Sequence, residues 1–487
     1  QYKLAEAFTV GDMYYESIIS STAPNRVSWF SGTINPPKGS KVNGTNKYMG
    51  GPTLDNRDSV GCERTDSGKP FSCVPLRWKT VPEYLQEAGI SWRVYQDKDN
   101  FGDDPLVMWK QYQTSAKKKG DLAQRGTSFP GLQKFFDDAR DGKLPEVAYI
   151  VAPMQLSEHP PYMPMDGAWL QGEVAKAVMH GKNWDSTALI YSYDETGGWA
   201  DHVVSPSPPQ SEESEWIEDP YDKSNGITPI GPGFRLPFYI VSPWTSGGHV
   251  FTEHAAHESQ IMFLEQWALA HGKPFTSEEI PTWRREQLSD LVKAFDFSSK
   301  DTSVPEVPHV RKPSQDIFTG HFNGADVCQA IHLKKVQPDI PYKKLNPSNS
   351  MEVNKGFKRL RGDVTEGRRL TFEAHNRALS HNGSKLKSSS SGKEHDEKDQ
   401  LFVVHWQGVN PKDNRFRIAT TDQLYVTKSL SLSKNEEKAA LFSLKDMGNG
   451  VGYSISELDS GKRLQLNEDG SVALGGDTYF QIYSVTL

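Results

Sequence analysis

Short apolar runs alternate with helix-spaced apolar residues over roughly the first 300 residues of the chain. Four runs are largely apolar and bounded by turn residues, as is typical of strands buried beneath helices. These runs are residues 90–95, 147–151, 188–193 and 238–241. Helical spacing predicts helices at residues 81–88, 171–180 and 257–270. The alternation predicts an α/β fold in which a mostly parallel sheet is flanked by helices.

The pattern changes beyond this region. Residues 301–350 are rich in proline and lack periodicity, and residues 385–400 combine a run of serines with mixed charges, which is typical of a mobile loop or linker. After residue 400 the apolar runs have the length of strands and are separated by turn sequences, which predicts a small antiparallel β domain. These runs are residues 402–406, 440–444 and 479–483.

The length and charge of the chain narrow its class. A chain of 487 residues is too long for one compact core, and we divide it into an α/β domain at 1–300, an irregular extension and linker at 301–400 and a β domain at 401–487. With a net charge of −7, the chain as a whole offers no broad basic field to nucleic acid or to an anionic membrane surface. No apolar run approaches the ~18 residues of a transmembrane helix.

The cysteines and two sequence triplets point to export. Cys62 and Cys73 lie close together, so a short-loop disulfide is expected in an oxidising compartment, and Cys328 is left over. Asn43 and Asn382 each begin an acceptor triplet for N-glycosylation. We therefore predict a secreted, extracellular glycoprotein.

A hydroxyl at a helix start is the first candidate for chemistry. Thr22 precedes Pro24 and the apolar run 27–30, so it lies at or just before the N-terminus of a predicted helix. There a hydroxyl faces free backbone N–H groups and the positive end of the helix dipole, which suits a phosphate. The alternative is that Thr22 only caps the helix.

Acidic and histidine side chains follow two of the predicted strands. Asp194 and Glu195 end the strand at 188–193, where ligands gather in α/β sheets, and such adjacent carboxylates repel each other unless a cation neutralises them. His159 follows the strand at 147–151. The alternatives are a solvated loop for the acidic pair and a structural role for the histidine.

Together these segments resemble a known family. The resemblance covers roughly residues 1–300, with segments in matching order and spacing: 5–8, 22–26, 99–103, 158–160, 193–195, 235–237 and 241–244. It is similar to the secreted phosphoesterases that include phospholipases C and acid phosphatases, and most like the fungal phospholipases C. The Thr-Ala-Pro-Asn-Arg start also looks like the nucleophile turn of sulfatases, which implies an alkaline-phosphatase-like fold.

The resemblance implies roles for five residues. Thr22 would be the nucleophile that forms a phosphothreonine intermediate, and also a metal ligand. Asp194 and Glu195 would be the other two ligands that this chain contributes to one divalent metal ion. Zinc and calcium are the first candidates for that ion, and magnesium and manganese are the alternatives. His159 would line the phosphate site, and His202 would be a second catalytic histidine. The implied activity is metal-dependent hydrolysis of phospholipid phosphodiesters, with only peripheral contact to lipid.

One expected part of the family pattern is not in this sequence. Members have an upstream Glu-Asn segment that completes the metal shell, often with another histidine. We expect either that a cleaved upstream chain stays bound and completes the site, that the segment lies outside the sequence considered, or that the fragment is inert. A disulfide from Cys328 to such a chain would explain the leftover cysteine, and a buried free thiol is the alternative.

Other functions stay open at this point. An acid phosphatase acting on phosphomonoesters would use the same residues, and a secreted binding protein with an inactive site is the non-enzyme alternative. A sulfatase is disfavoured because threonine cannot become the formylglycine that sulfatases form from serine or cysteine. A lipase-like diesterase should have an apolar rim, for which the candidates are Trp29, Trp109, Trp169 and Trp199.

Overall fold

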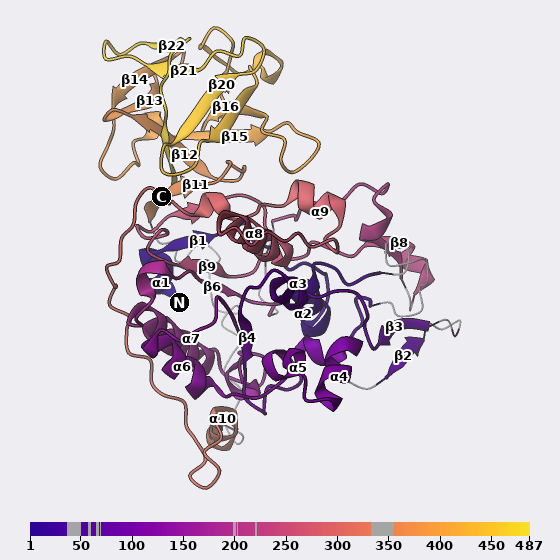
Figure 1. The fold of residues 1–487 in the computed structure, drawn as a ribbon. Coiled ribbons are helices and arrows are strands. Elements are labelled where there is room, and N and C mark those ends of the chain that lie inside the picture. Colours follow the sequence, from indigo (N-terminus) through magenta and orange to yellow (C-terminus); the bar gives the residue numbers. More distant parts are fainter. Residues whose placement is uncertain are drawn as a thin grey trace.

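The computed structural model shows two lobes (Figure 1). An α/β lobe holds the N-terminus, and a lobe of antiparallel strands stands on it, with the C-terminus near the junction. The residues that the structure describes are 1–36, 50–56, 60–64, 68, 70–197, 201, 203–219, 222–332 and 355–487. Within this part, no helix is long and apolar enough to cross a membrane.

The helices confirm the expected periodicity. The predicted helix at 257–270 is α8 with the same bounds, and the one at 81–88 is α3, which a capping box of Thr80 and Glu83 begins. The helices of the described residues are α1 (Tyr2–Ala7), α2 (Thr22–Ser31), α3 (Val81–Glu87), α4 (Lys110–Lys117), α5 (Asp121–Gly126), α6 (Leu132–Asp141), α7 (Pro164–Met179), α8 (His257–Ala270), α9 (Thr282–Gln287) and α10 (Gly324–His332).

The α/β lobe has a mixed sheet, so the expectation of a mostly parallel one is corrected. Strand β1 pairs in parallel with β10 but antiparallel with β9, which in turn pairs antiparallel with β6. Strands β4 and β5 form a separate parallel pair, and β7 and β8 an antiparallel one. The strands are β1 (Thr9–Gly11), β2 (Gly61–Arg64), β3 (Pro70–Val74), β4 (Trp92–Tyr95), β5 (Val147–Ile150), β6 (Leu189–Ser192), β7 (Trp216–Glu218), β8 (Ile227–Pro229), β9 (Phe238–Val241) and β10 (Val250–Phe251).

The β lobe begins earlier than expected. Strands β11 to β14 lie within residues 356–390, which the sequence analysis assigned to the irregular extension and linker. The polar residues there belong to paired strands, in which Lys387 is exposed and Ser380 and Ser388 are buried. Strand β11 also pairs in parallel with β10, so one sheet runs through both lobes. The strands are β11 (Gly356–Arg361), β12 (Arg369–Ala374), β13 (Arg377–His381), β14 (Leu386–Ser390), β15 (Phe402–Trp406), β16 (Phe416–Thr420), β17 (Tyr425–Val426), β18 (Leu432–Ser433), β19 (Phe442–Asp446), β20 (Tyr453–Glu457), β21 (Leu464–Leu466), β22 (Val472–Leu474) and β23 (Gln481–Thr486).

Three of the tryptophans suggested for an apolar rim pack in or against a hydrophobic core. Trp109 is fully buried, and Trp29 packs against the same core cluster around α2 and α8. Trp169 packs against the cluster around α6 and α7, and Trp199 lies outside the described residues. Trp109 is therefore a core residue, whereas Trp29 and Trp169 are half-buried and keep part of their surface exposed.

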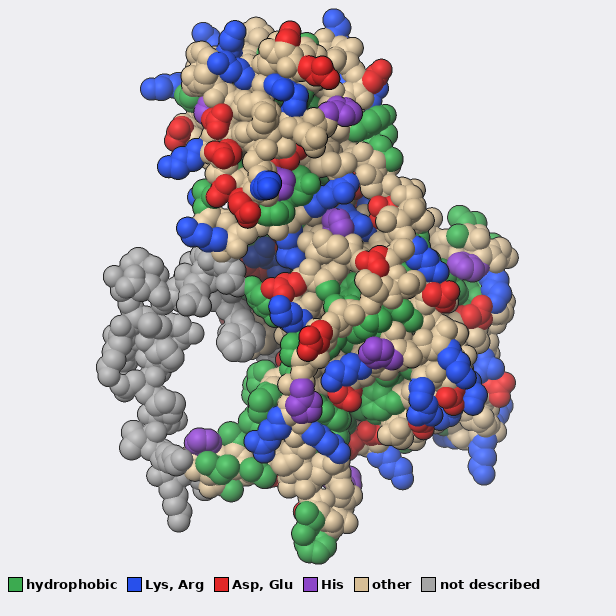
Figure 2. Space-filling model, turned by 90° about the vertical axis from the view of Figure 1, so that its left-hand side faces the viewer, with side chains coloured by type: hydrophobic (Ala, Val, Ile, Leu, Met, Phe, Trp, Pro, Cys, Tyr) green, Lys and Arg blue, Asp and Glu red, His purple; other side chains and the backbone are tan. Residues whose placement is uncertain are grey.

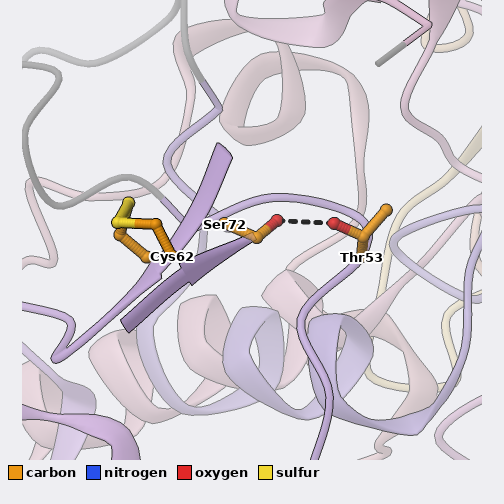
Figure 3. Close-up of a disulfide and its surroundings, with 4 residues drawn as sticks. Thr53, Cys62 and Ser72 are labelled. Atoms are coloured by element: carbon orange, nitrogen blue, oxygen red, sulfur yellow. Dashed lines mark hydrogen bonds between the residues drawn. A yellow bond between two sulfur atoms is a disulfide. The ribbon is translucent and has the colours of Figure 1, made fainter. Parts of the chain in front are cut away.

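The predicted disulfide is present. Cys62 and Cys73 join β2 to β3, and next to it the Thr53 and Ser72 hydroxyls are hydrogen-bonded at 2.7 Å (Figure 3). Cys328 is a free, half-buried cysteine of α10. Of the two glycosylation triplets, the one at Asn43 lies outside the described residues.

Candidate active site

The start of α2 is built around a buried asparagine. Thr22 is the first residue of the helix, as expected, and Ser21 is its N-cap. The fully buried Asn25 side chain accepts a hydrogen bond from the Ile18 N–H at 2.9 Å. Its amide donates to the carbonyls of Ile18 and Ser20 at 3.0 and 3.1 Å. These bonds fix the loop that leads into the helix, and with it the place of the Thr22 hydroxyl.

A buried ion triad holds the same helix from behind. Glu258 of α8 accepts hydrogen bonds from Ser28 of α2 at 2.5 Å and from Ser17 at 2.8 Å. Arg284 of α9 pairs with Glu258 at 2.8 Å and with Glu215 at 2.9 Å, and all three charged side chains are almost fully buried. Buried carboxylates need such partners because they have lost their hydration.

The three residues suggested as metal ligands come together. The Thr22 hydroxyl donates a hydrogen bond of 2.5 Å to Oε1 of Glu195, across 173 positions of sequence. Arg26, one turn further along α2, donates through Nε to Oδ2 of the adjacent Asp194 at 2.7 Å. The Arg26 guanidinium also lies 3.5 Å from the carboxylate of Asp103. The helix start thus faces the end of β6.

Burial and Arg26 set the charge of the acidic pair. Burial opposes ionisation of Asp194, but the Arg26 guanidinium outweighs it and keeps the pKa of Asp194 below its usual value. Burial raises the pKa of Glu195, against the Thr22 hydrogen bond and the charge of His159, which lower it. The neighbouring carboxylates therefore differ in proton affinity, which is an arrangement found where acid–base work is done.

Two further buried groups fix the chain around the acidic pair. Nε2 of His257, at the start of α8, is hydrogen-bonded to the main-chain oxygen of Asp194 at 2.8 Å, and its Nδ1 to the Tyr14 hydroxyl at 2.8 Å. Glu16 accepts hydrogen bonds of 3.1 Å from the N–H groups of Thr196 and Phe234. Burial raises the pKa of Glu16 to about 7.

His159 lies at the edge of this site. Its Nδ1 is hydrogen-bonded to the Pro160 carbonyl at 2.7 Å, which fixes the proton on Nδ1 and leaves Nε2 as an acceptor in the neutral ring. When it is protonated, His159 lowers the pKa of both Glu195 and Asp103, though burial raises each more. His202 lies outside the described residues, so its role stays a prediction.

The predicted ligands fit part of a coordination shell. Two carboxylates and a hydroxyl are hard oxygen donors, which suit calcium, magnesium or manganese and are also found on zinc. Among the described residues, no group of three His, Cys, Asp or Glu side chains is placed to hold a metal ion. Thr22, Asp194 and Glu195 would therefore need further ligands, and the metal prediction stays a prediction.

Sequence reasoning missed three residues of this arrangement. Arg26 stands four positions after Thr22 in the Thr-Ala-Pro-Asn-Arg motif. This spacing places both residues on one face of a helix, so the sequence itself indicates that Arg26 lies near Thr22. Asp103 ends another quoted segment but had no assigned role. His257 begins the predicted helix at 257–270 and had no assigned role, yet its Nε2 is hydrogen-bonded to the main-chain oxygen of Asp194.

The N-terminal half of the chain, which holds this site, matches a known protein family. The sequence model of the Phosphoesterase family matches residues 1–269, which include α2, the end of β6 and the His159 loop. The chain belongs to the Phosphoesterase family. The resemblance inferred from the sequence motifs is thereby confirmed.

The relatives within the Phosphoesterase family are named as phospholipases C. The chain is 33% identical to a non-hemolytic phospholipase C of Burkholderia pseudomallei over 63% of this chain and 45% of that protein. It is 34% identical to a non-hemolytic phospholipase C of Pseudomonas aeruginosa, over 72% of this chain and 48% of that protein. A non-specific phospholipase C3 of Arabidopsis thaliana is 24% identical over 77% and 68%. The chain thus spans about half the length of the two bacterial relatives.

Proposed function

We propose that this protein hydrolyses phosphodiester bonds of phospholipids, as a phospholipase C, with Thr22 as the nucleophile. The observation that carries the proposal is the 2.5 Å hydrogen bond from the Thr22 hydroxyl to Glu195. A hydroxyl at the first position of a helix, with a carboxylate to accept its proton and free N–H groups beside it, suits attack on a phosphate. The names of the relatives support a phospholipid substrate.

The reaction would run in two displacements. Thr22 Oγ1 forms a bond to phosphorus while the bond from phosphorus to the glycerol oxygen breaks, and the hydroxyl proton passes to Glu195. The departing diacylglycerol oxygen takes a proton from Nε2 of protonated His159, with His202 as the other candidate. Water then attacks phosphorus and gives a proton to the same histidine, while the bond from phosphorus to Oγ1 breaks and Glu195 returns its proton to Oγ1. The phosphorylated head group leaves, and the Thr22 hydroxyl and the protonated histidine are restored.

A divalent ion is part of the proposal. Thr22, Asp194 and Glu195 would hold it, and it would supply positive charge to the phosphoryl oxygens. Arg26 keeps Asp194 ionised and oriented. The disulfide between Cys62 and Cys73 supports export to an oxidising compartment, so we propose that the enzyme works outside the cell.

The ion pairs of Arg26 favour a phosphodiester over a phosphomonoester as the substrate. A monoester carries an extra negative charge that an enzyme would match with a nearby cation. The Arg26 guanidinium is already engaged by Asp194 and Asp103. The acid-phosphatase alternative therefore predicts a monoester rate that exceeds the diester rate, and the diesterase proposal predicts the reverse.

The test compares two substitutions of Thr22, one that removes the hydroxyl and one that keeps it. Thr22→Ala should lower hydrolysis of a water-soluble chromogenic phosphodiester below about a tenth of wild type, since at least ~1.4 kcal/mol of barrier would return. Thr22→Ser keeps the hydroxyl and should retain more activity. Acid quenching during turnover, followed by peptide mass spectrometry, should find a phosphate on Thr22. Activity of Thr22→Ala near the wild-type level would refute the assignment.

A further inference from the structure

A tight turn after the α/β domain projects two apolar side chains into solvent. Ile317 is 87% exposed and Phe318 is 90% exposed. In Figure 1 this turn hangs below α10, at the end of the molecule opposite the β lobe. Figure 2 shows a projection at the lower end of another face, with an apolar tip. Adjacent apolar residues at such exposure are costly in water unless a partner covers them.

The turn is built to hold this shape. Asp316 Oδ1 accepts hydrogen bonds from the N–H groups of Phe318 at 3.0 Å and Thr319 at 2.7 Å. Gln315 and Phe322 close its base as an antiparallel bridge. The exposure of the tip is therefore a property of an ordered turn rather than of a frayed end.

The base of the turn is anchored beside the candidate active site. The Phe322 ring lies 5.6 Å from a tryptophan ring of α7. Nδ1 of His321 lies 3.8 Å from the carboxylate of Asp99, whose segment continues to Asp103. The Asp99 main-chain oxygen accepts a hydrogen bond of 2.8 Å from Met154, where the loop that carries His159 begins.

Basic side chains precede the tip in the sequence. Residues 307–323 contain Arg311, Lys312 and two histidines against a single acid, Asp316, although the whole chain is acidic. Arg311 and Lys312 are both exposed. An apolar tip above a basic stem matches a phospholipid surface, where acyl chains lie beneath a layer of phosphates. A projecting pair of side chains offers too little area for a stable protein interface, which needs about 800 Å² from each partner.

We propose that the turn at residues 314–323 docks this protein on a phospholipid surface. Ile317 and Phe318 enter the acyl layer, and Arg311 and Lys312 contact the phosphates. The docking holds the loops of Asp99 and His159 against the bilayer, where lipid head groups are the substrate. This last step rests on the proposed function, whereas the docking itself does not.

Binding to vesicles tests the docking without any catalysis. The wild type should co-sediment with phosphatidylcholine vesicles and bind more tightly when about a fifth of the lipid is phosphatidylglycerol. The double variant Ile317→Ser/Phe318→Ser should bind about tenfold more weakly or worse to both. Arg311→Gln/Lys312→Gln should lose the preference for the anionic lipid. The matched control is Val409→Ser, an 88% exposed residue of the β lobe, which should bind like wild type. Equal binding by the wild type and the Ile317/Phe318 variant would overturn the proposal.

Two activity assays separate the docking from the chemistry. On a water-soluble phosphodiester the Ile317/Phe318 variant should stay within about twofold of wild type, while on vesicles its rate should fall about tenfold. An equal fall in both assays would mean that the turn supports the site or the fold, and would overturn docking. If the wild type hydrolyses neither substrate, the proposed function fails and the vesicle-binding result still decides the docking.

Discussion

The hydroxyl of Tyr193 donates a hydrogen bond of 2.7 Å to Oε2 of Glu158. Tyr193 precedes the acidic pair at the end of β6, and Glu158 precedes His159, so this bond joins the two segments of the candidate site. Glu158 has a positive φ of 65°, which is uncommon for a residue with a side chain. Gln171 of α7 donates to the same carboxylate at 3.1 Å and helps to hold this conformation.

Loss of the Tyr193 hydroxyl should therefore slow the reaction. Tyr193→Phe removes the hydrogen bond to Glu158 and the two that the hydroxyl accepts, from Gln1 at 2.6 Å and from Gln171 at 3.0 Å. We expect kcat to fall about three- to tenfold with little change in KM, because the two segments are no longer held in place while the substrate contacts remain. Steady-state kinetics on a soluble phosphodiester would measure both constants. Tyr191→Phe is the matched control. Tyr191 lies on β6, two positions before Tyr193, and its hydroxyl donates to the Gln171 carbonyl. Equal losses in both variants would refute a positioning role.

Arg284 should be essential for stability. Arg284→Ala would leave Glu215 and Glu258 buried without a cation, and we expect it to lower the free energy of unfolding by about 3–5 kcal/mol. The neighbouring Arg285→Ala, whose side chain is 31% exposed in its pair with Glu265, should cost about 1 kcal/mol or less. Urea unfolding followed by circular dichroism gives both values. Similar costs for the two arginines would contradict this account of the triad.

Much of the local structure could be predicted from the sequence, but less of the pairing. The helix at 257–270 and the strand at 238–241 have the expected bounds, since their apolar spacing is clear. The direction of β9 was not readable, because all four of its residues are buried and such a strand looks alike in either orientation. Strands β13 and β14 were missed because each has only one or two apolar residues, too few for a clear alternation: Ala378 and Leu379 in β13 and Leu386 in β14.

In the candidate site, too, the sequence did not show which distant residues contact each other. Its motif identified Thr22, Asp194 and Glu195, and the structure brings them together. The Arg26 contact joins residues 168 positions apart, and no periodicity reports such a contact. Knowledge of the fold was needed to see that Arg26 supplies the positive charge which the acidic pair requires.

Asp104 should make stability fall as the pH rises. Burial raises the pKa of Asp104 to about 7, although Gln96 and Leu106 donate hydrogen bonds to it. The unfolded carboxyl loses its proton near pH 4, so from about pH 4 to 7 the folded state binds a proton that the unfolded state has lost. The resulting stability is complete below about pH 4 and is lost through pH 7, by roughly 4 kcal/mol at most.

Asp104→Asn tests this pH dependence. Asparagine stays neutral and keeps an acceptor for the Leu106 N–H, so the variant's free energy of unfolding should decline less between about pH 4.5 and 7 than that of wild type. Urea titrations at several pH values in this window would measure the decline. Parallel curves for wild type and variant would show that Asp104 ionises normally in the folded protein.

The disulfide should stabilise the fold by limiting the unfolded chain. The cysteines are 11 positions apart, and for a loop of this size Cys62→Ser/Cys73→Ser should lower the free energy of unfolding by about 3 kcal/mol. Reduction of the wild type should have a similar effect. Cys328→Ser removes a free thiol and should change stability by less than about 1 kcal/mol. A double variant as stable as wild type would show that the disulfide adds little.

The pairing of β10 with β11 limits how this protein can diverge. Val250 lies opposite Leu360, and Arg361 of β11 reaches across to donate to the Trp244 carbonyl at 2.9 Å. Replacement of the β lobe by an unrelated domain would therefore remove the strand that pairs with β10. The edge of β10 would then be unpaired, which favours aggregation. The first strand of the β lobe must therefore be inherited together with the α/β lobe.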